Sequence, residues 1–148
     1  MTDLPSTARL ALPLLAMAQA QKEVTHNEAL ALLDLLVQPV VEAGPQAAPP
    51  PVPGAGQGWI VAAGATGEWA GHDRALALWT AGGWRFVAPV AGMRTLRLGD
   101  GAWLRFDGEE WIEPATIASP AGGATVDSEA RAAIAALILA LVCHGLLI

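Results

Sequence analysis

The apolar and polar positions of this chain change their spacing several times, and each change marks a predicted element. Residues 59–114 alternate short apolar runs with turn residues, whereas the flanking stretches are richer in Ala and Leu at helical spacing. We therefore predict an α+β protein. Its predicted parts are an N-terminal arm and helix (1–43), a Pro/Gly-rich linker (44–58), a small Trp-rich antiparallel β domain (59–114), a loop (115–126) and an apolar C-terminal oligomerisation helix (127–148).

The first predicted helix follows the stretch AQAQKEV. Thr25-His-Asn-Glu28 has the spacing of a capping box, in which the Thr hydroxyl and the Glu carboxylate satisfy backbone N–H groups reciprocally. Apolar residues recur at helical spacing behind it, and Pro39 limits their run. We predict a helix of about 12 residues whose N-cap is formed by Thr25 and Glu28.

The predicted β domain contains six short runs, GWIVAAG, ALALW, WRFV, RTLRL, AWLRF and EWIE. Gly82-Gly83, Asp100-Gly101 and Asp107-Gly108 separate consecutive runs, and such pairs supply the positive φ values of tight hairpins. The pattern indicates an antiparallel meander of about six strands. The Gly-rich loop 64–73 is expected to be a turn-rich segment that packs Trp69.

All six tryptophans lie in the predicted β domain. Bulky rings can bury much area in a small sheet, which is their usual role. The alternative is that Trp79, Trp84, Trp103 and Trp111 stack on sugar rings at the surface.

The last predicted helix has no polar side. Asp127 can cap its start and Gly145 can end it. One stripe contains the candidate oligomerisation residues Ala130, Ile134, Leu137, Ile138 and Leu141, and the opposite side is also apolar. A membrane span needs about 20 apolar residues and usually basic flanks, which this run lacks. We expect the helix to be buried in a bundle, with copies of itself or with the N-terminal helix, and we predict no membrane span.

Charge and composition narrow the functional classes further. Charged residues make up only 15% of the chain, the net charge is −6, and the eight basic residues are scattered, so we predict no nucleic-acid binding. A single cysteine excludes an internal disulfide and a cysteine-based zinc site. So weakly charged a surface is most simply covered by other subunits.

Candidate chemistry is sparse. Glu23-x-x-His26 is half of a di-metal carboxylate motif, but no second copy of the motif exists. The loop carrying His72 and Asp73 is followed by a predicted strand, not by the helix that a phosphate cradle needs. We therefore predict no catalytic, cofactor-binding or metal residues, no cofactor, and no enzymatic activity.

Three long motifs suggest a family. The stretches AQAQKEVTHNEALALLD, GWIVAAGATGEWAGHDRALALWTAGGWRFVAPVAGM and GAWLRFDGEEW resemble, from about Ala8 to Glu113, a domain-of-unknown-function family found among the structural genes of tailed phages and of gene transfer agents of alphaproteobacteria. The resemblance implies a virion structural protein at the base of a head spike or tail fibre, and it brings no catalytic residues.

The expected function is therefore that of a non-enzymatic, homo-oligomeric base or adaptor in a phage-like particle. Expected partners are copies of the chain in threefold or fivefold arrangement and other capsid, spike or fibre proteins. The protein would be assembled in the bacterial cytoplasm and released with the particle. The alternative is a carbohydrate-binding module that recognises host surface polysaccharide through exposed tryptophans.

Overall fold

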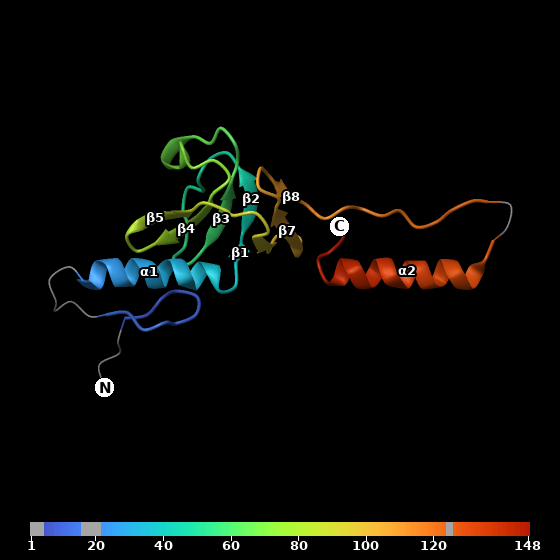
Figure 1. The fold of residues 1–148 in the computed structure, drawn as a ribbon, viewed down its shortest axis with the longest axis horizontal. Helices are drawn as coiled ribbons and strands as arrows, with labels where there is room; N and C mark the ends of the chain where they lie inside the picture. The colour runs from blue at the N-terminus through green and yellow to red at the C-terminus, as the bar shows by residue number, and fades with distance from the viewer. Residues whose placement is uncertain (1–4, 16–21, 124–125) are drawn as a thin grey trace.

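The computed structural model describes residues 5–15, 22–123 and 126–148 (Figure 1). Within these residues, two α-helices flank eight short strands and one 3₁₀ turn. The elements in chain order are α1 (Lys22–Leu36), β1 (Val40–Val41), β2 (Ala43–Gln46), β3 (Gly58–Val61), η1 (Gly67–Trp69), β4 (Leu76–Thr80), β5 (Gly83–Val87), β6 (Arg94–Arg97), β7 (Ala102–Phe106), β8 (Trp111–Ile112) and α2 (Ser128–Cys143). The α+β class is confirmed.

The strands form two four-stranded sheets, with the orders β1-β6-β7-β8 and β2-β3-β4-β5. All six predicted runs are strands, namely β3 to β8, and among these six the consecutive strands of the same sheet pair antiparallel. The single meander is wrong, because the chain changes sheet between β5 and β6. Pro89 lies in that connection and has no N–H with which to continue the ladder.

The predicted hairpin turns are confirmed. Thr80 pairs with Gly83 at the end of β4, and Arg97 pairs with Ala102 across the turn that contains Asp100 and Gly101. Gly101 has φ +71°, a conformation that L side chains adopt only with strain.

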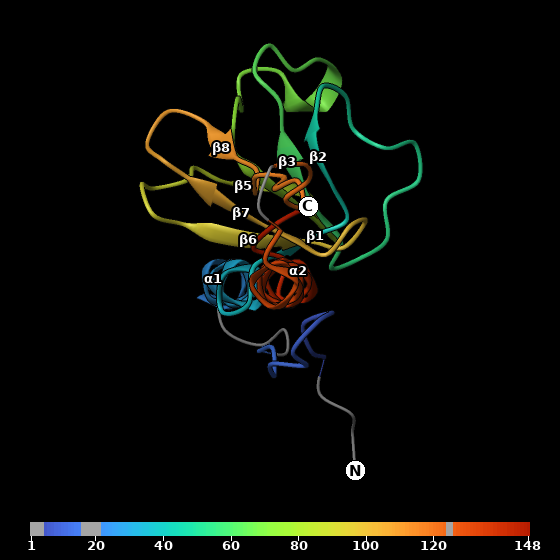
Figure 2. The ribbon, with the colours of Figure 1, turned by 90° about the vertical axis from the view of Figure 1, so that its right-hand side faces the viewer.

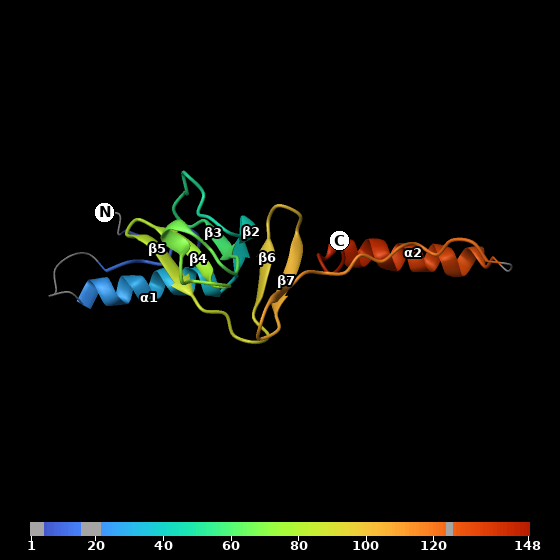
Figure 3. The same cartoon turned by 90° about the horizontal axis from the view of Figure 1, so that it is seen from above.

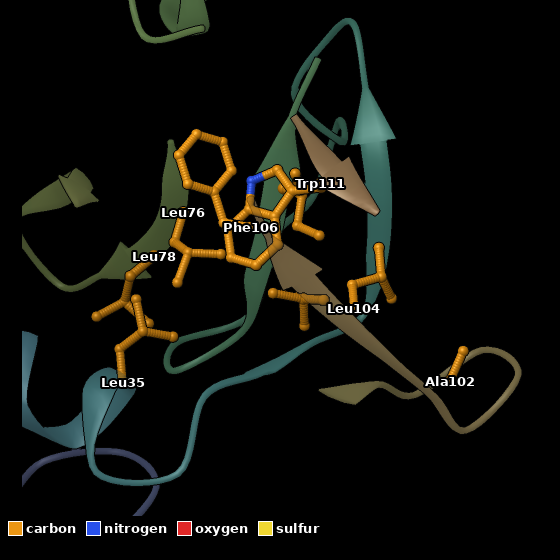
Figure 4. Close-up of a cluster of buried hydrophobic side chains, with 9 residues drawn as sticks. Leu35, Leu76, Leu78, Ala102, Leu104, Phe106 and Trp111 are labelled. Carbon is orange, nitrogen blue, oxygen red and sulfur yellow. The ribbon is translucent and has the colours of Figure 1, made fainter. Parts of the chain in front are cut away.

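The two sheets share one hydrophobic core (Figure 4). Leu35 of α1 contributes to it from the side. Both sheets supply the rest, which are Val41, Ile60, Leu76, Leu78, Ala102, Leu104, Phe106 and Trp111. A second cluster contains Trp59, Val61, Ala65, Trp69 and Ala77, with Trp79, Trp84 and Phe86 packed against it. Residues of β3 contribute to both clusters, so this strand is buried on both faces.

The predicted linker over 44–58 and the predicted domain start at residue 59 need correction. Gly44 to Gln46 belong to β2, which pairs in parallel with β3, and Val40–Val41 pair in parallel with β6. Gln46 and Ala47 continue this contact by accepting hydrogen bonds from the N–H groups of Ala62 and Thr66. The prolines rule out a helix here but allow extended chain at a sheet edge. The segment is therefore part of the β domain.

The predicted N-cap of α1 is wrong. The helix already includes Lys22, so Thr25 lies inside it and is exposed. Glu28 does not close a capping box with Thr25 but forms an ion pair with Arg85 at 2.9 Å. Lys and Glu are good helix formers, which allows the helix to begin before the capping pattern. Residues 18–21 of the AQAQK motif lie outside the described residues.

The N-terminal arm, residues 5–15, is held against α1 by a buried carboxylate. Asp34 is 2% exposed and accepts hydrogen bonds from the Thr7 hydroxyl at 2.8 Å and from the backbone N–H groups of Arg9 and Leu10. The Arg9 guanidinium donates to the carbonyls of Asp34, Leu35 and Gln38. Carbonyls at the end of a helix lack partners within the helix, and a cation beside them also complements the negative end of the helix dipole.

Helix α2 projects from the β domain on the side opposite α1 (Figures 1 and 3). Both helices are seen end-on in Figure 2, so their axes are nearly parallel, although they lie at opposite ends of the molecule. The expected packing of this helix on α1 of the same chain is therefore wrong. The helix ends at Cys143 and not at residue 148. Among the described residues, no helix has both the length and the apolar character of a membrane span.

Candidate functional site

The chain leaves the β domain and returns to it at the same sheet edge. The segment between these two points forms an arm. We define the arm as residues 114–148. Its outgoing part, up to residue 123, is exposed and lacks helix or strand, and α2 forms the return path. Figure 3 shows the two running alongside each other, away from β6 and β7.

Local signals define both ends of α2. The Asp127 side chain accepts a hydrogen bond from the Ala130 N–H at 2.8 Å, which confirms the predicted N-cap. Gly145 has φ +67° and its N–H donates to the Val142 carbonyl, while the N–H of Leu146 donates to that of Leu141. These bonds satisfy carbonyls at the end of the helix, as predicted for a glycine stop.

The returning end of the arm is fixed to the sheet. The Trp103 N–H of β7 donates to the Gly145 carbonyl at 2.9 Å, and the Ile148 N–H donates to the Ala115 carbonyl. Leu147 between them is buried. A side chain on Gly145 would collide with the carbonyl of Gly101 and press on the Trp103 ring. Only glycine fits this contact.

No residue of α2 is buried within the chain. Leu137 is 65% exposed and Leu139 is 64% exposed, and at 100° per residue these two side chains leave the helix on opposite sides. Of the candidate oligomerisation residues, Ala130, Ile134, Leu137 and Leu141 are exposed and Ile138 is half-buried. A helix that is apolar all round is normally covered by protein or lipid.

The base of the arm adjoins the outer face of sheet β1-β6-β7-β8. Along β7, Ala102, Leu104 and Phe106 point inward, which places Trp103 and Arg105 on the outer face. The register pairs Arg94 directly with Arg105 and Leu96 with Trp103. Arg94, Arg105 and Trp103 border a hollow of about 190 Å³. Its lining is Arg94, Trp103, Arg105, Ile112, Glu113, Pro114 and Leu146.

Arg94 and Arg105 differ from the other arginines in having no hydrogen bond or ion pair within the part of the chain that the structure describes. The others all have partners: Arg9 and Arg131 bond to carbonyls, Arg74 to Glu110, Arg85 to Glu28, and Arg97 to Asp100 and Glu113. Like charges directly opposite on neighbouring strands are destabilising. The outer face thus carries two arginines without a hydrogen-bonded or ion-paired partner in a chain whose net charge is −6, although the Asp107 carboxylate interacts with Arg105 at longer range.

Perturbed pKa values occur near this face but belong to structural contacts. Hydrogen bonds from Arg97 lower the pKa of the Asp100 carboxyl, and those to Asp100 and Glu113 raise the pKa of Arg97. Asp107 accepts from the N–H groups of Glu110 and Glu109, which lowers its pKa, and the charge of Arg105 adds a smaller effect. These bonds close turns and join neighbouring strands.

A second hollow, of about 310 Å³, lies at the α1 end between the N-terminal arm, α1 and the β4–β5 hairpin. Leu14, Val24 and Trp79 form part of its wall. Its charged rim residues, Glu28 and Arg85, neutralise each other. Asp34 also lines it, but its carboxylate is engaged by the N-terminal arm.

The structure does not bring the four candidate sugar-stacking tryptophans together. Trp79 and Trp84 pack against each other with ring centroids 5.0 Å apart, and Trp84 also contacts Trp59 and Trp69. Trp111 lies in the core, and its Nε1–H donates to the Arg74 carbonyl at 2.8 Å. Trp79, Trp84 and Trp103 are all half-buried, but Trp103 lies apart from the other two, on the outer face of its own sheet. These tryptophans look alike in the sequence, but they belong to strands of two different sheets, and side chains alternate between the two faces of each sheet. The rings therefore lie apart.

Residues 64–73 pack as expected around Trp69, which is fully buried. His72 stacks on Phe86 with a centroid distance of 3.6 Å and an interplanar angle of 4°. Within the described ranges, no three His, Cys, Asp or Glu side chains are grouped so that they could hold a metal ion.

Residues 26–112 match the model of a family described as a protein of unknown function, DUF2793. The chain belongs to this family. The match spans most of α1 and all eight strands, and the arm with α2 lies outside it. No curated protein sequence matches the chain significantly.

The paired arginines of this DUF2793 chain were missed from the sequence, although a signal exists. With Asp100-Gly101 as the turn, Arg97 opposes Ala102. Three positions farther from the turn on each strand, Arg94 opposes Arg105. The position of this pair at the base of the arm could not be predicted, because it depends on the path of residues 114–148.

Proposed function

We propose that this DUF2793 chain is a non-enzymatic structural component of a phage-like particle, either a tailed phage or a gene transfer agent. Several copies would form the base or adaptor of a head spike or tail fibre. The chain would be assembled in the bacterial cytoplasm and then remain with the released particle.

The observation that carries this proposal is the exposed apolar arm. A helix with Leu137 and Leu139 on opposite sides offers apolar surface on more than one side. Permanent homo-oligomers commonly cover such surface with the same element of a symmetry-related copy. A particle built from repeated subunits supplies such copies.

The motif resemblance supports the particle context. The long motifs from Ala8 to Glu113 resemble proteins found among phage and gene-transfer-agent structural genes. The family match covers the β domain, which would be the body of the subunit, and the arm extends from that body.

The test is whether the chain travels with particles. Particles from the source bacterium would be purified on a density gradient and probed by mass spectrometry and by immunogold labelling with antibodies to the chain, with an abundant cytoplasmic enzyme as the negative control. We expect the chain to co-sediment with particles and a deletion strain to release particles without the spike or fibre. Complete particles from the deletion strain, with the chain confined to the cell extract, would refute the proposal.

A carbohydrate-binding module is the second candidate, and the position of Trp103 favours it. This ring is half-exposed beside Arg94 and Arg105, so it could stack on a sugar whose polar groups meet the guanidinium groups. Glycan-array binding that is lost in Trp103→Ala but retained in Trp84→Phe would support it. Equal binding by both variants would exclude this face as the sugar site.

A further inference from the structure

The free arginine pair and the acidic start of α2 lie at opposite ends of the arm. Arg94 and Arg105 border the hollow at its base, together with Leu146 just beyond the helix. Asp127 and Glu129 are exposed at the distal end, where α2 begins. The helix of 16 residues separates these groups by about 24 Å, so they cannot meet within one chain.

We propose that two copies of this chain pair their α2 helices antiparallel about a two-fold axis, so that Asp127 and Glu129 of one copy reach Arg94 and Arg105 of the other. The proposal rests on the self-association of the arm in the proposed function and specifies its geometry. It differs from the threefold or fivefold bundle expected from the sequence.

Charge complementarity selects the antiparallel arrangement. A parallel bundle would gather the acidic helix starts at one end, where Arg131 already donates to the Gly122 carbonyl, and would leave Arg94 and Arg105 without an ion-pair partner. The antiparallel pair neutralises both sites at once, because a two-fold axis makes each contact twice. It also brings the positive end of each helix dipole to the negative end of its partner.

The apolar residues fit this arrangement. When the ends of the two helices are matched, Ala130 opposes Leu141 and Ile134 opposes Leu137, and all four residues belong to one stripe of the helix. A small residue then lies opposite a large one near each end, and branched residues meet in the middle. The hollow at the base adds Trp103 and Leu146 to this apolar surface.

Disulfide trapping gives a direct test of helix direction. A disulfide forms only when two Cα atoms lie within about 7 Å. Ala130 and Leu141 are exposed on the same stripe of α2, whereas Cys143 lies on the other side of the helix. In a Cys143→Ser background, the double variant Ala130→Cys, Leu141→Cys should form, under mild oxidation, a covalent dimer in which residue 130 of one copy is joined to residue 141 of the other, as identified by peptide mapping.

Two outcomes of this test would overturn the proposal. Linkage of residue 130 to residue 130, or of residue 141 to residue 141, would indicate a parallel bundle. If the chain sediments as a monomer at tens of micromolar, α2 and the arginine pair do not bind a second copy. They would then bind another ligand, such as an anionic glycan. The parallel outcome would leave the particle proposal standing, since co-sedimentation with particles tests that separately.

Charge reversal tests the ionic contact independently. Arg105→Glu should raise the dimer dissociation constant about tenfold, because the Glu would face the acidic helix start of the partner. Adding Glu129→Arg to the same chain should restore most of the affinity. Arg85→Glu, at the α1 end, is the matched control and should leave the dissociation constant unchanged. Equal weakening by Arg85→Glu, or failure of the double variant to recover, would contradict the proposed contact.

Discussion

Trp69 and Trp111 are both buried tryptophans, but their ring N–H groups differ. Trp111 donates to the Arg74 carbonyl, whereas Nε1 of Trp69 has no hydrogen-bond partner in the described structure. A buried donor without a partner keeps the cost of its desolvation and receives no bond in return. Trp69 therefore stabilises the fold by its ring area alone.

Replacing each ring by Phe should separate these contributions. Trp69→Phe and Trp111→Phe both lose ring volume, but only the second also breaks a hydrogen bond. We expect Trp111→Phe to lower the free energy of unfolding by about 1–2 kcal/mol more than Trp69→Phe. Urea unfolding of the two variants measures the difference, and equal losses would contradict it.

Gly145 is the residue on which the return of the arm to the sheet depends. Gly145→Ala should cost about 2–4 kcal/mol and expose the Trp103 amide to hydrogen exchange, because a Cβ here meets the Gly101 carbonyl. Gly122→Ala is the matched control, since Gly122 has φ +72° but no atom within 4 Å of the added carbon. It should cost only the backbone strain of about 1 kcal/mol. Similar losses in both variants would show that the close approach is unimportant.

The ion pair between Arg97 and Asp100 predicts a small pH dependence of stability. The folded pKa of Asp100 is lowered mainly by its hydrogen bond from Arg97, so the stabilisation is present above the unfolded pKa, near ~3.9, and is lost as the pH falls through the folded pKa. Because this carboxylate is partly exposed, Asp100→Asn should cost less than about 1 kcal/mol at neutral pH. The difference should disappear in acid.

Unfolding free energies of the unaltered chain and of Asp100→Asn, measured between neutral and strongly acidic pH, check this. In an Arg97→Gln background the same substitution should change the pH dependence very little. A difference that persists at the lowest pH would point to a cause other than the ion pair.

At the scale of elements, α2 is a helix whose exposed side chains contribute little to the fold of its own chain. Leu137→Glu should leave the thermal unfolding temperature of the β domain within about 2 °C, since Leu137 is not buried against the domain. It should also weaken self-association strongly, because a carboxylate would enter the proposed apolar contact. Calorimetry and sedimentation of the same sample measure both effects, with Ala63→Glu on the β domain as the control.

The elements that the sequence predicts well are those defined locally. Strands β3 to β8 follow from alternation and from turn pairs such as Asp100-Gly101, and Asp127 and Gly145 mark the ends of α2 correctly. The start of α1 was misplaced, because a capping-box pattern also occurs inside a helix of good helix formers. Strands β1 and β2 were missed for two reasons. Val40–Val41 is too short to show a period. Both strands also pair in parallel, β1 with β6 and β2 with β3, so no hairpin turn in the sequence marks either pair.

The candidate surface was predictable only in part, for a similar reason. The apolar stripe through Ile134, Leu137 and Leu141 can be seen in the sequence. The separation of Trp79 from Trp103 depends on the division into two sheets, which alternation along single strands does not define. The distance of α2 from α1 depends on the course of the outgoing part of the arm.

The whole molecule is elongated, with the β domain and α1 at one end and the arm at the other (Figures 1 and 3). The antiparallel pairing would place two β domains at opposite ends of a joined pair of arms. Small-angle X-ray scattering should then give a distance distribution with two maxima, one within a domain and one between domains. Leu137→Glu should give only the first, whereas a single broad maximum for the unaltered chain would contradict this shape.

Because the arm departs from and returns to a single edge, its span is independent of the sheet that carries it. Two extra helical turns, about seven residues, would extend it by about 10 Å while leaving the contacts of Gly145 and Ala115 unchanged. Lengthening or shortening by whole turns would thus adapt the same body to gaps of different width between neighbours.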